Sequence, residues 1–275
     1  MNVFFQAKAL KKINIAPLKR LGQNFLVDKT AIRKILRSAD LQIGDVVLEI
    51  GPGAGALTKI IGGKVEKVIA VEKDPRMVKI LEENLRDCKN IEIIQEDILK
   101  ISNSQYGQMS TYKIVANLPF YITSPVIRKF LESANPPEKM ILVIQKELAQ
   151  RICAKPPAMN ILAVSVQIYS KPKIIDYISK TAFWPKPKVD AAILEIAGIK
   201  KIFGENFMEA FFKIVKAGFS HPRKQISNNF LSLKSSSAKL NKKTISAWLL
   251  ANKIQPSQRA ETLSINDWIN LTKTL

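Results

Sequence analysis

The sequence has few of the residues that build metal sites and disulfide frameworks. Its 275 residues include two cysteines, Cys88 and Cys153, and one histidine, His221. Two distant thiols give neither a disulfide framework nor a metal-binding motif, and they fit a reducing cytoplasm. A single imidazole excludes any site built from several histidines. We therefore expect a cytoplasmic protein without a metal ion.

Long apolar runs are also absent. No stretch is long enough to span a bilayer, so we expect no membrane partner. The N-terminus opens with a short apolar patch that basic residues follow, which is the reverse of the order in a secretory signal. The first 27 residues contain basic residues and no acid, so an organelle-targeting segment stays an open alternative.

Acidic residues are outnumbered. The chain has 43 Lys and Arg against 23 Asp and Glu, a net charge of +20. The excess is strong from Lys180 onward, where 16 basic residues face six acidic ones. Such a charge favours a polyanionic partner, with nucleic acid ahead of an anionic membrane.

The first 200 residues alternate between short apolar runs and helical patterns. Five runs predict strands of a mostly parallel sheet covered by helices, an α/β fold. Two later runs predict further strands, and these are expected to pair antiparallel. The first five are residues 45–50, 67–72, 91–97, 113–119 and 139–145, and the later two are 162–170 and 190–197. Between the second and third runs, Asp74 is expected to cap a helix with Pro75 at its first position.

After about Gly198 the apolar residues recur only at helical spacing. We therefore expect two domains. Residues 1–200 form an α/β domain with a basic N-terminal extension, and residues 201–275 form a small all-helical domain. No strong interface signal is present, and we expect a monomer.

A glycine turn with acids at the neighbouring strand ends predicts an adenosine site. The turn "EIGPG" contains Glu49, Gly51 and Gly53, and it follows the first predicted strand. Glycines let a backbone approach a ligand closely. Glu72 ends the second strand, where a carboxylate can accept from both ribose hydroxyls. Asp97 ends the third strand and can reach an adenine amine.

The ligand is expected to be S-adenosylmethionine rather than a dinucleotide. An acid at Glu49 suits the cationic amino-acid end of S-adenosylmethionine better than it suits a pyrophosphate. The sequence also lacks the phosphate-binding loop of nucleotide triphosphatases. Lys73 and Ile98 follow Glu72 and Asp97 directly, and we assign them to the same site.

The stretch "NLPF" at the end of the fourth strand predicts a clamp for an adenine amine. That nitrogen is a poor nucleophile because its lone pair is delocalised into the ring. The Asn117 side-chain oxygen and the Leu118 carbonyl can accept its two N–H bonds and direct its lone pair. Pro119 fixes the turn, and Phe120 can stack on an unstacked base.

A second stacking face is expected from elsewhere in the chain. "FWPKP" supplies Phe183 and Trp184, and Phe183 is the preferred candidate. Tyr121 is expected to pack in the protein rather than touch the base.

Taken together, these motifs resemble those of the ribosomal RNA adenine dimethyltransferases that act on the small subunit. The resemblance runs from about Leu18 to the C-terminus. It rests on "LGQNFLVD", "VLEIGPGAGALT", "VEKD", "QEDIL", "NLPFYITSPV", "FWPKPKVDAAI" and "RAETLSINDW". It implies a Rossmann-like methyltransferase domain that dimethylates two adjacent adenines in a hairpin near the 3′ end of small-subunit RNA. The helical domain would help to hold the RNA and the pre-ribosomal small subunit.

The resemblance also implies roles for single residues. Asn24 and Leu26 of "QNFL" would contact the methionine end of the cofactor, together with Gly51. Glu72 would hold the ribose and Asp97 the adenine ring of the cofactor. Asn117 would be the key catalytic residue.

Three alternatives stay open on the sequence. The related antibiotic-resistance methylases of large-subunit RNA share the cofactor and amine motifs. A non-catalytic assembly or transcription factor on the same fold would have a damaged cofactor site. Here the residues assigned to that site are all present, namely Glu49, Gly51, Glu72, Asp97 and Asn117. A dinucleotide oxidoreductase is the third alternative, and it would not explain the large positive charge of the chain.

Overall fold

The computed structural model describes residues 17–18, 21–102, 111–233 and 241–275. Most of the basic N-terminal extension lies outside these residues. The chain forms two compact units. The first consists of the described part of Met1–Ala149 with Ser170–Ile199, and the second of Gln150–Tyr169 with Lys200–Leu275.

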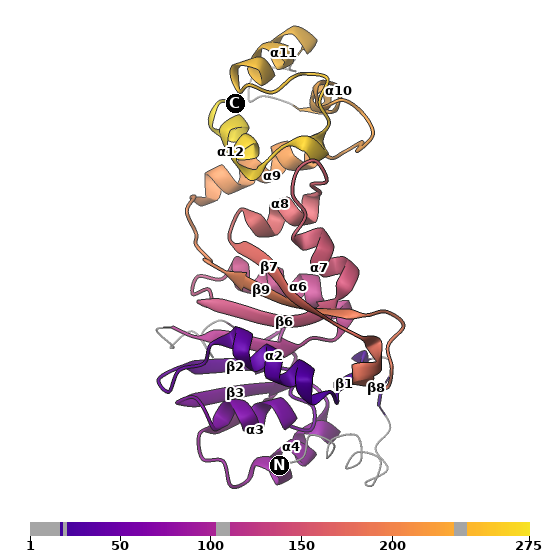
Figure 1. The fold of residues 1–275 in the computed structure, drawn as a ribbon. Coiled ribbons are helices and arrows are strands. Elements are labelled where there is room, and N and C mark those ends of the chain that lie inside the picture. The colour runs from indigo at the N-terminus through magenta and orange to yellow at the C-terminus, as the bar shows by residue number, and fades with distance from the viewer. Residues whose placement is uncertain (1–16, 19–20, 103–110, 234–240) are drawn as a thin grey trace. The chain divides into compact units, whose positions relative to one another are not determined.

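The first unit is built on a seven-stranded sheet of order β4-β3-β2-β5-β6-β9-β7 (Figure 1). The five strands from β4 to β6 pair in parallel, and β9 is antiparallel to both of its neighbours. The predicted α/β fold is therefore confirmed, and so is an antiparallel closing strand for the run 190–197, which forms β9. The strands are β2 (Val46–Ile50), β3 (Lys67–Glu72), β4 (Ile91–Gln95), β5 (Lys113–Asn117), β6 (Lys139–Gln145), β7 (Lys171–Ile178) and β9 (Ala191–Ala197).

Helices cover both faces of this sheet. On one face α2 and α3 pack on the central strands, and Ile35 and Ile61 are fully buried there. Leu81 and Leu85 of α4 pack against Ala70 of β3 on the same face, because Ala70 lies two residues after Val68 of the α2–α3 cluster. The connection from β5 to β6 runs in the opposite direction across the sheet, so its right-handed crossover places α6 on the other face. The helices are α2 (Lys29–Ala39), α3 (Ala56–Gly62), α4 (Pro75–Leu85), α6 (Thr123–Leu131) and α7 (Lys146–Ile152), with short 3-10 turns η2 (Phe120–Ile122) and η3 (Lys180–Ala182).

The order of the strands decides where a ligand can bind. The chain passes from β2 to β3 on one side, and it later returns to place β5 on the other side of β2. Open sheets of this type bind ligands at the carboxyl ends of the strands beside such a switch point. A small two-stranded pair of β1 (Phe25–Leu26) and β8 (Phe183–Trp184) is separate from the main sheet.

The local signals for α4 act as expected. The Asp74 side chain accepts from Arg76 N at 3.1 Å, and Pro75 stands at the first helical position. Pro at this position loses no hydrogen bond, because the first amides of a helix have no partner within it.

The second unit is all-helical in the part of the chain that the structure describes. Its core surrounds the fully buried rings of Phe211, Phe230 and Trp268. Ser264 and Asn241 form capping boxes that begin two of the helices. The helices are α8 (Ile161–Gln167), α9 (Glu205–Gly218), α10 (Ile226–Asn229), α11 (Lys242–Ala251) and α12 (Ile265–Lys273), with 3-10 turns η4 (Phe230–Ser232) and η5 (Ala260–Thr262).

Residues 162–170 do not form the strand that the apolar run predicted. Residues 162–167 belong to α8, and residues 168–170 follow its end. The helix begins where the Asn160 side chain accepts from Ala163 N at 3.0 Å. Val164 and Ile168 then join the same apolar cluster as Phe211. A short apolar run fits a strand and a buried helix equally well, and here the Asn160 N-cap favours the helix.

One strand of the main sheet carries almost no strand signal in the sequence. β7 contains two lysines, a proline and an aspartate, and its residues are mostly exposed or half-buried. It lies at the edge of the sheet, where charged residues and proline are tolerated because one side makes no ladder hydrogen bonds. No helix among the described residues is long and apolar enough to cross a membrane.

The contact between α9 and α12 generates a test of the second unit. A Cβ added at Gly218 would meet the Trp268 ring, with Cζ3 at 2.9 Å. Glycine-to-alanine changes inside helices normally stabilise by about 1 kcal/mol. Here we expect Gly218→Ala to destabilise by about 1–3 kcal/mol, because the fully buried ring must move.

Thermal unfolding of the two proteins measures the difference. Gly204→Ser is the matched control, because a Cβ there meets nothing within 4 Å and serine caps helices well. An unchanged or raised melting temperature for Gly218→Ala would contradict this packing.

Candidate active site

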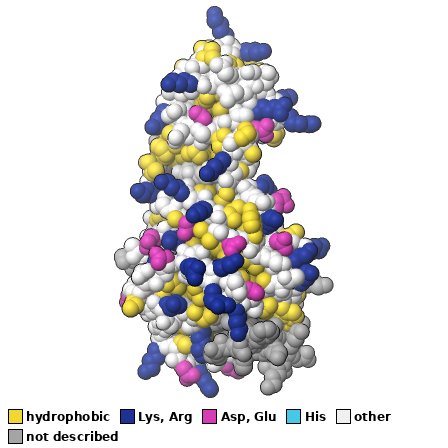
Figure 2. All heavy atoms as spheres, viewed as in Figure 1, with side chains coloured by type: hydrophobic (Ala, Val, Ile, Leu, Met, Phe, Trp, Pro, Cys, Tyr) yellow, Lys and Arg dark blue, Asp and Glu magenta, His cyan; other side chains and the backbone are white. Residues whose placement is uncertain are grey.

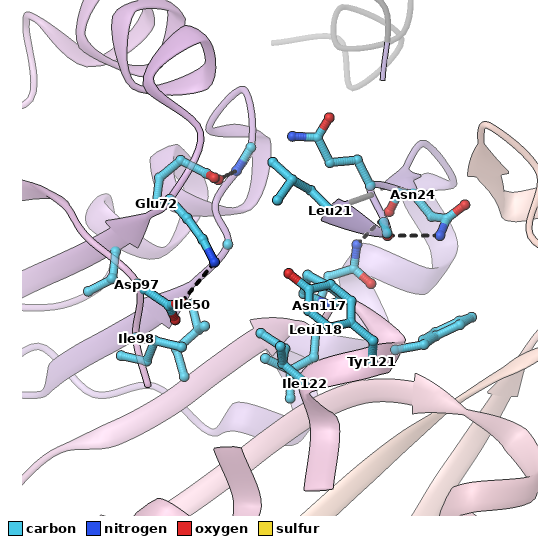
Figure 3. Close-up of a pocket in the computed structure, with 18 of the residues that line it drawn as sticks. Leu21, Asn24, Ile50, Glu72, Asp97, Ile98, Asn117, Leu118, Tyr121 and Ile122 are labelled. Carbon is cyan, nitrogen blue, oxygen red and sulfur yellow. Dashed lines mark hydrogen bonds and ion pairs between the residues drawn. The ribbon is translucent and has the colours of Figure 1, made fainter. Parts of the chain in front are cut away.

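A pocket of about 780 Å³, partly open to solvent, lies at the carboxyl ends of β2, β3 and β5 (Figure 3). It brings together most of the residues predicted for the site from separate motifs. Those lining it are Asn24, Gly51, Gly53, Glu72, Lys73, Asp97, Ile98, Asn117, Leu118, Pro119 and Phe120. In Figure 3, Glu72 and Asp97 lie on one side of the pocket, and Asn24 and Asn117 lie on the other.

The glycine turn after β2 needs its glycines for conformation and for space. Gly51 and Gly53 have φ of +70° and +59°, where residues with a Cβ are strained. A Cβ at Gly53 would also lie 2.9 Å from Phe25 Cε1. The backbone of the turn therefore forms part of the pocket wall directly.

Glu72 is nearly buried, and both of its carboxylate oxygens are held by backbone amides. Oε1 accepts from Asp74 N at 2.8 Å, and Oε2 accepts from Gly53 N at 3.2 Å. Burial raises the pKa of Glu72, and these hydrogen bonds oppose that rise. The two bonds fix the carboxylate against the glycine turn while it lines the pocket.

Asp97 is paired with its predicted neighbour in the site. Lys73 Nζ donates to Asp97 Oδ2 at 2.8 Å, and Leu99 N donates to Oδ1 at 3.0 Å. Partial burial raises the pKa of Asp97, but the bonds from Lys73 and Leu99 outweigh it and lower the pKa below its ordinary value. Asp97 is thus an ionised acceptor at neutral pH.

Glu49 lies in a smaller adjoining pocket of about 380 Å³, which Leu26, Gly51 and Asn117 also line. Its side chain is 2% exposed, and its Oε2 atom has no hydrogen-bond partner among the described residues. The pKa of Glu49 is raised to about 8, mainly because the side chain is buried. A hydrogen bond from the Thr58 hydroxyl opposes this rise, and the nearby charge of Glu72 adds to it. An uncompensated buried carboxyl of this kind suits a cationic ligand group.

The orientation of Asn117 follows from one hydrogen bond. Its Nδ2 donates to the Asn24 backbone carbonyl at 2.9 Å, and the two residues point toward each other in Figure 3. Only the nitrogen of the amide can face a carbonyl oxygen, so Oδ1 is left as an acceptor. Leu118, the next residue, is anchored by its own amide, which donates to the Val143 carbonyl at 3.2 Å.

The aromatic residues depart from the prediction. Phe183 is 4% exposed, pairs with Leu26 in the β1–β8 ribbon, and belongs to the apolar core rather than to the pocket lining. Tyr121, expected to pack away from the base, is instead 55% exposed and lines the pocket beside Gly22. Phe120 lines the pocket while packing partly against the core that contains Phe183.

Sequence reasoning gave no role to eight pocket residues besides Tyr121. Each lies inside one of the motifs that carry the family resemblance, so membership of those motifs was the available signal. They are Leu21, Gly22, Gln23, Phe25, Ile50, Val71, Glu96 and Ile122. Gly22 has a φ of +59°, and a Cβ there would lie 3.2 Å from Tyr121 Cδ1.

These features fit S-adenosylmethionine. The glycine turn gives a backbone cradle, Glu72 offers hydroxyl acceptors, and the orphaned oxygen of Glu49 offers a partner for an ammonium. The fold and the site define a Rossmann-like methyltransferase that uses S-adenosylmethionine. In the parts of the chain that are described, no group of three or more His, Cys, Asp or Glu could hold a metal ion.

Comparison with known proteins specifies the class further. The family model described as ribosomal RNA adenine dimethylase matches residues 17–274. A "Ribosomal RNA small subunit methyltransferase A" of Dehalococcoides mccartyi (strain CBDB1) is 41% identical over 92% of this chain and 86% of its own length. The protein of the same name from Geobacillus sp. (strain WCH70) is 36% identical over 97% of this chain and 94% of its own. This chain belongs to the ribosomal RNA adenine dimethylase family.

Solved structures agree on the fold. The 23S rRNA methyltransferase ErmE has a TM-score of 0.74 and 25% identity, covering 92% of this chain and 99% of its own. A dimethyladenosine transferase from Plasmodium falciparum has a TM-score of 0.75 and 24% identity, and the match covers 89% of this chain and 94% of that protein.

The raised pKa of Glu49 predicts how the stability of the free protein depends on pH. The native state keeps the Glu49 proton up to about pH 8, whereas the unfolded chain releases it near 4.5. The native state therefore binds more protons in this window, and Glu49 lowers the stability progressively as the pH rises through it.

The variant Glu49→Gln removes this titration and keeps the shape of the side chain. We expect its melting temperature to exceed that of the wild type by a few degrees at about pH 9, and by less at about pH 5. Calorimetric scans at both pH values measure the difference. Equal differences at the two pH values would show that Glu49 does not titrate as described.

Proposed function

We propose that this protein transfers methyl groups from S-adenosylmethionine to the exocyclic amines of adenines in small-subunit ribosomal RNA. The observation that carries the chemistry is the Asn117 amide, whose Nδ2 is bound by the Asn24 carbonyl and whose Oδ1 is left to accept from an amine. The assignment of small-subunit RNA as the target is supported by the relatives, which are named for the small subunit.

The reaction needs an adenine nitrogen with an available lone pair. Asn117 Oδ1 and the Leu118 carbonyl accept the two amine hydrogens, which favours a tetrahedral nitrogen with its lone pair directed away from both. Pro119, with φ −55° and ψ 128°, holds the turn between these acceptors and Phe120. Because the acceptors are in place before the substrate arrives, little reorganisation is needed during the reaction.

The cofactor site supplies the other reactant. When bound, S-adenosylmethionine supplies an electrophilic methyl group on its sulfonium. Glu72 would accept from the ribose hydroxyls, while Asp97 and Ile98 would contact the adenine ring. Glu49, Asn24 and Leu26 would hold the methionine end, next to Gly51 and Asn117.

The target base must leave its helix or loop stack to enter this pocket. Three aromatic residues line the pocket, and Phe25 is buried against Gly53 of the glycine turn. We therefore assign the stacking faces to Phe120 and the exposed Tyr121. Phe183 would support Phe120 from the core rather than stack on the base. The proposed target is the pair of adjacent adenines in a hairpin near the 3′ end.

The positive charge of the protein fits an RNA substrate. Figure 2 shows Lys and Arg side chains over much of the visible face, with fewer Asp and Glu among them. The second unit carries a basic, exposed segment at His221, Arg223 and Lys224. We propose that this helical unit helps to bind RNA and the pre-ribosomal small subunit, and that the protein acts in the cytoplasm as a monomer.

The large-subunit methylases are the second candidate, because the structure of ErmE has the same fold. The higher identity to the small-subunit relatives favours the first assignment. A non-catalytic role is disfavoured, since Glu49, Glu72, Asp97 and Asn117 form an intact site.

Mapping of the modified nucleotides tests this function. Purified protein is incubated with labelled S-adenosylmethionine and undermethylated small-subunit RNA or particles, with large-subunit RNA as the matched control. We expect dimethyladenosine at two adjacent adenines of the small-subunit RNA. Label in large-subunit RNA alone, or no label from a protein that binds the cofactor, would refute the assignment.

Replacement of Asn117 tests the acceptor. We expect Asn117→Ala to lower kcat by about a hundredfold or more, as the loss of one preorganised polar group does in other enzymes. Asn117→Asp keeps an acceptor oxygen but places its second oxygen against the Asn24 carbonyl, so it should also be slow. Calorimetric titration with S-adenosylmethionine should show that both variants keep much of their affinity. Near wild-type turnover by Asn117→Ala would disprove the acceptor role.

A further inference from the structure

Gln23 lines the pocket, and both ends of its side-chain amide are engaged. Oε1 accepts from Leu18 N at 2.8 Å, and Nε2 donates to Asp74 Oδ2 at 2.9 Å. The first bond joins Gln23 to a residue five positions earlier in the chain. The second ties Gln23 to a residue 51 positions later in the chain, at the start of α4.

Asp74 is a strong and rigid anchor. Its side chain is 2% exposed, accepts from Arg76 N, and is paired with the Arg76 guanidinium at 2.6 Å. Burial raises the pKa of Asp74, but bonds from Arg76 and Gln23 outweigh it and lower the pKa below its ordinary value. The bond from Gln23 is therefore made to an ionised carboxylate, which is stronger than a bond between neutral groups.

Hydrogen bonds to Asp74 connect the two sides of the pocket. The Asp74 backbone amide donates to Glu72 Oε1 on the side of the proposed ribose carboxylate. Its carboxylate binds Gln23, whose next neighbour Asn24 offers the carbonyl that receives Asn117 Nδ2. A chain of hydrogen bonds and one peptide link thus runs from Glu72 to the Asn117 amide.

We propose that Gln23 is a positioning residue for methyl transfer: by tying the N-terminal segment to Asp74, it places the Asn24 carbonyl and so directs Asn117 Oδ1 at the target amine. This proposal rests on the amine role of Asn117 given under the proposed function. Gln23 does not itself touch the reacting atoms. Without its bond to Asp74, the Asn24 carbonyl shifts and the Asn117 amide loses its fixed direction.

The test is a double-mutant cycle in the full chain, followed by steady-state transfer of a radiolabelled methyl group to undermethylated small-subunit RNA. Gln23→Leu should lower the rate about tenfold to a hundredfold, because small misplacements of a catalytic group cost that much. The KM for S-adenosylmethionine should change by less than about threefold, since the effect is on orientation. In the Asn117→Ala background, Gln23→Leu should change the rate by less than about twofold.

Gln42→Leu is the matched control. Its Nε2 is hydrogen-bonded to Asp40 in an exposed loop, so the same substitution there should leave the rate unchanged. If Gln23→Leu does not fold, as judged by its melting temperature, Gln23→Glu takes its place in the cycle. That variant keeps the acceptor for Leu18 N but sets a second carboxylate against Asp74.

The outcomes separate this proposal from the function on which it rests. An inactive wild-type protein would refute the function itself. An active wild type with a slow Asn117→Ala but a normal Gln23 variant would refute only the positioning role. A raised KM with unchanged kcat, or an equal loss in both backgrounds, would also overturn it, because Gln23 would then act independently of Asn117.

Discussion

The hydrogen bond from Asn117 Nδ2 to the Asn24 carbonyl is the contact on which the site depends. It joins the end of a central strand to a segment 93 residues earlier in the chain. The sheet supplies one half of this contact, because β5 ends beside β2 at the switch point of the strand order. The N-terminal segment supplies the other half, and it is held by the β1–β8 ribbon and by Gln23.

The carboxylates of the site are given different environments for different tasks. Asp97 is kept ionised by Lys73, and Glu72 is bound by two backbone amides. Glu49 is buried with an oxygen that forms no hydrogen bond within the described part of the chain. Held in this way, one pocket can offer hydroxyl acceptors at one end and a partner for a cationic group at the other. The free protein carries the cost of burying Glu49, which a cationic ligand would offset.

Much of this arrangement was predictable, because parallel strands buried on both faces are continuous apolar runs and end at marked residues. Gly51, Glu72, Asp97 and Asn117 could therefore be assigned to one edge of the sheet. Residues 162–170 were taken for a strand because a short apolar run has no decisive period, and β7 was missed because edge strands tolerate charge. The exposure of Tyr121, the burial of Phe183 and the bond from Gln23 to Asp74 depend on contacts between distant segments, which no local pattern encodes.

The most direct measurement is a crystal structure of this protein with a bisubstrate analogue that links the cofactor to the exocyclic nitrogen of an adenine. The account predicts that this nitrogen lies within hydrogen-bond distance of Asn117 Oδ1, with Asn117 Nδ2 still bound to the Asn24 carbonyl. An adenine whose nitrogen lies away from Asn117, or an Asn117 amide turned so that Nδ2 faces the base, would contradict it.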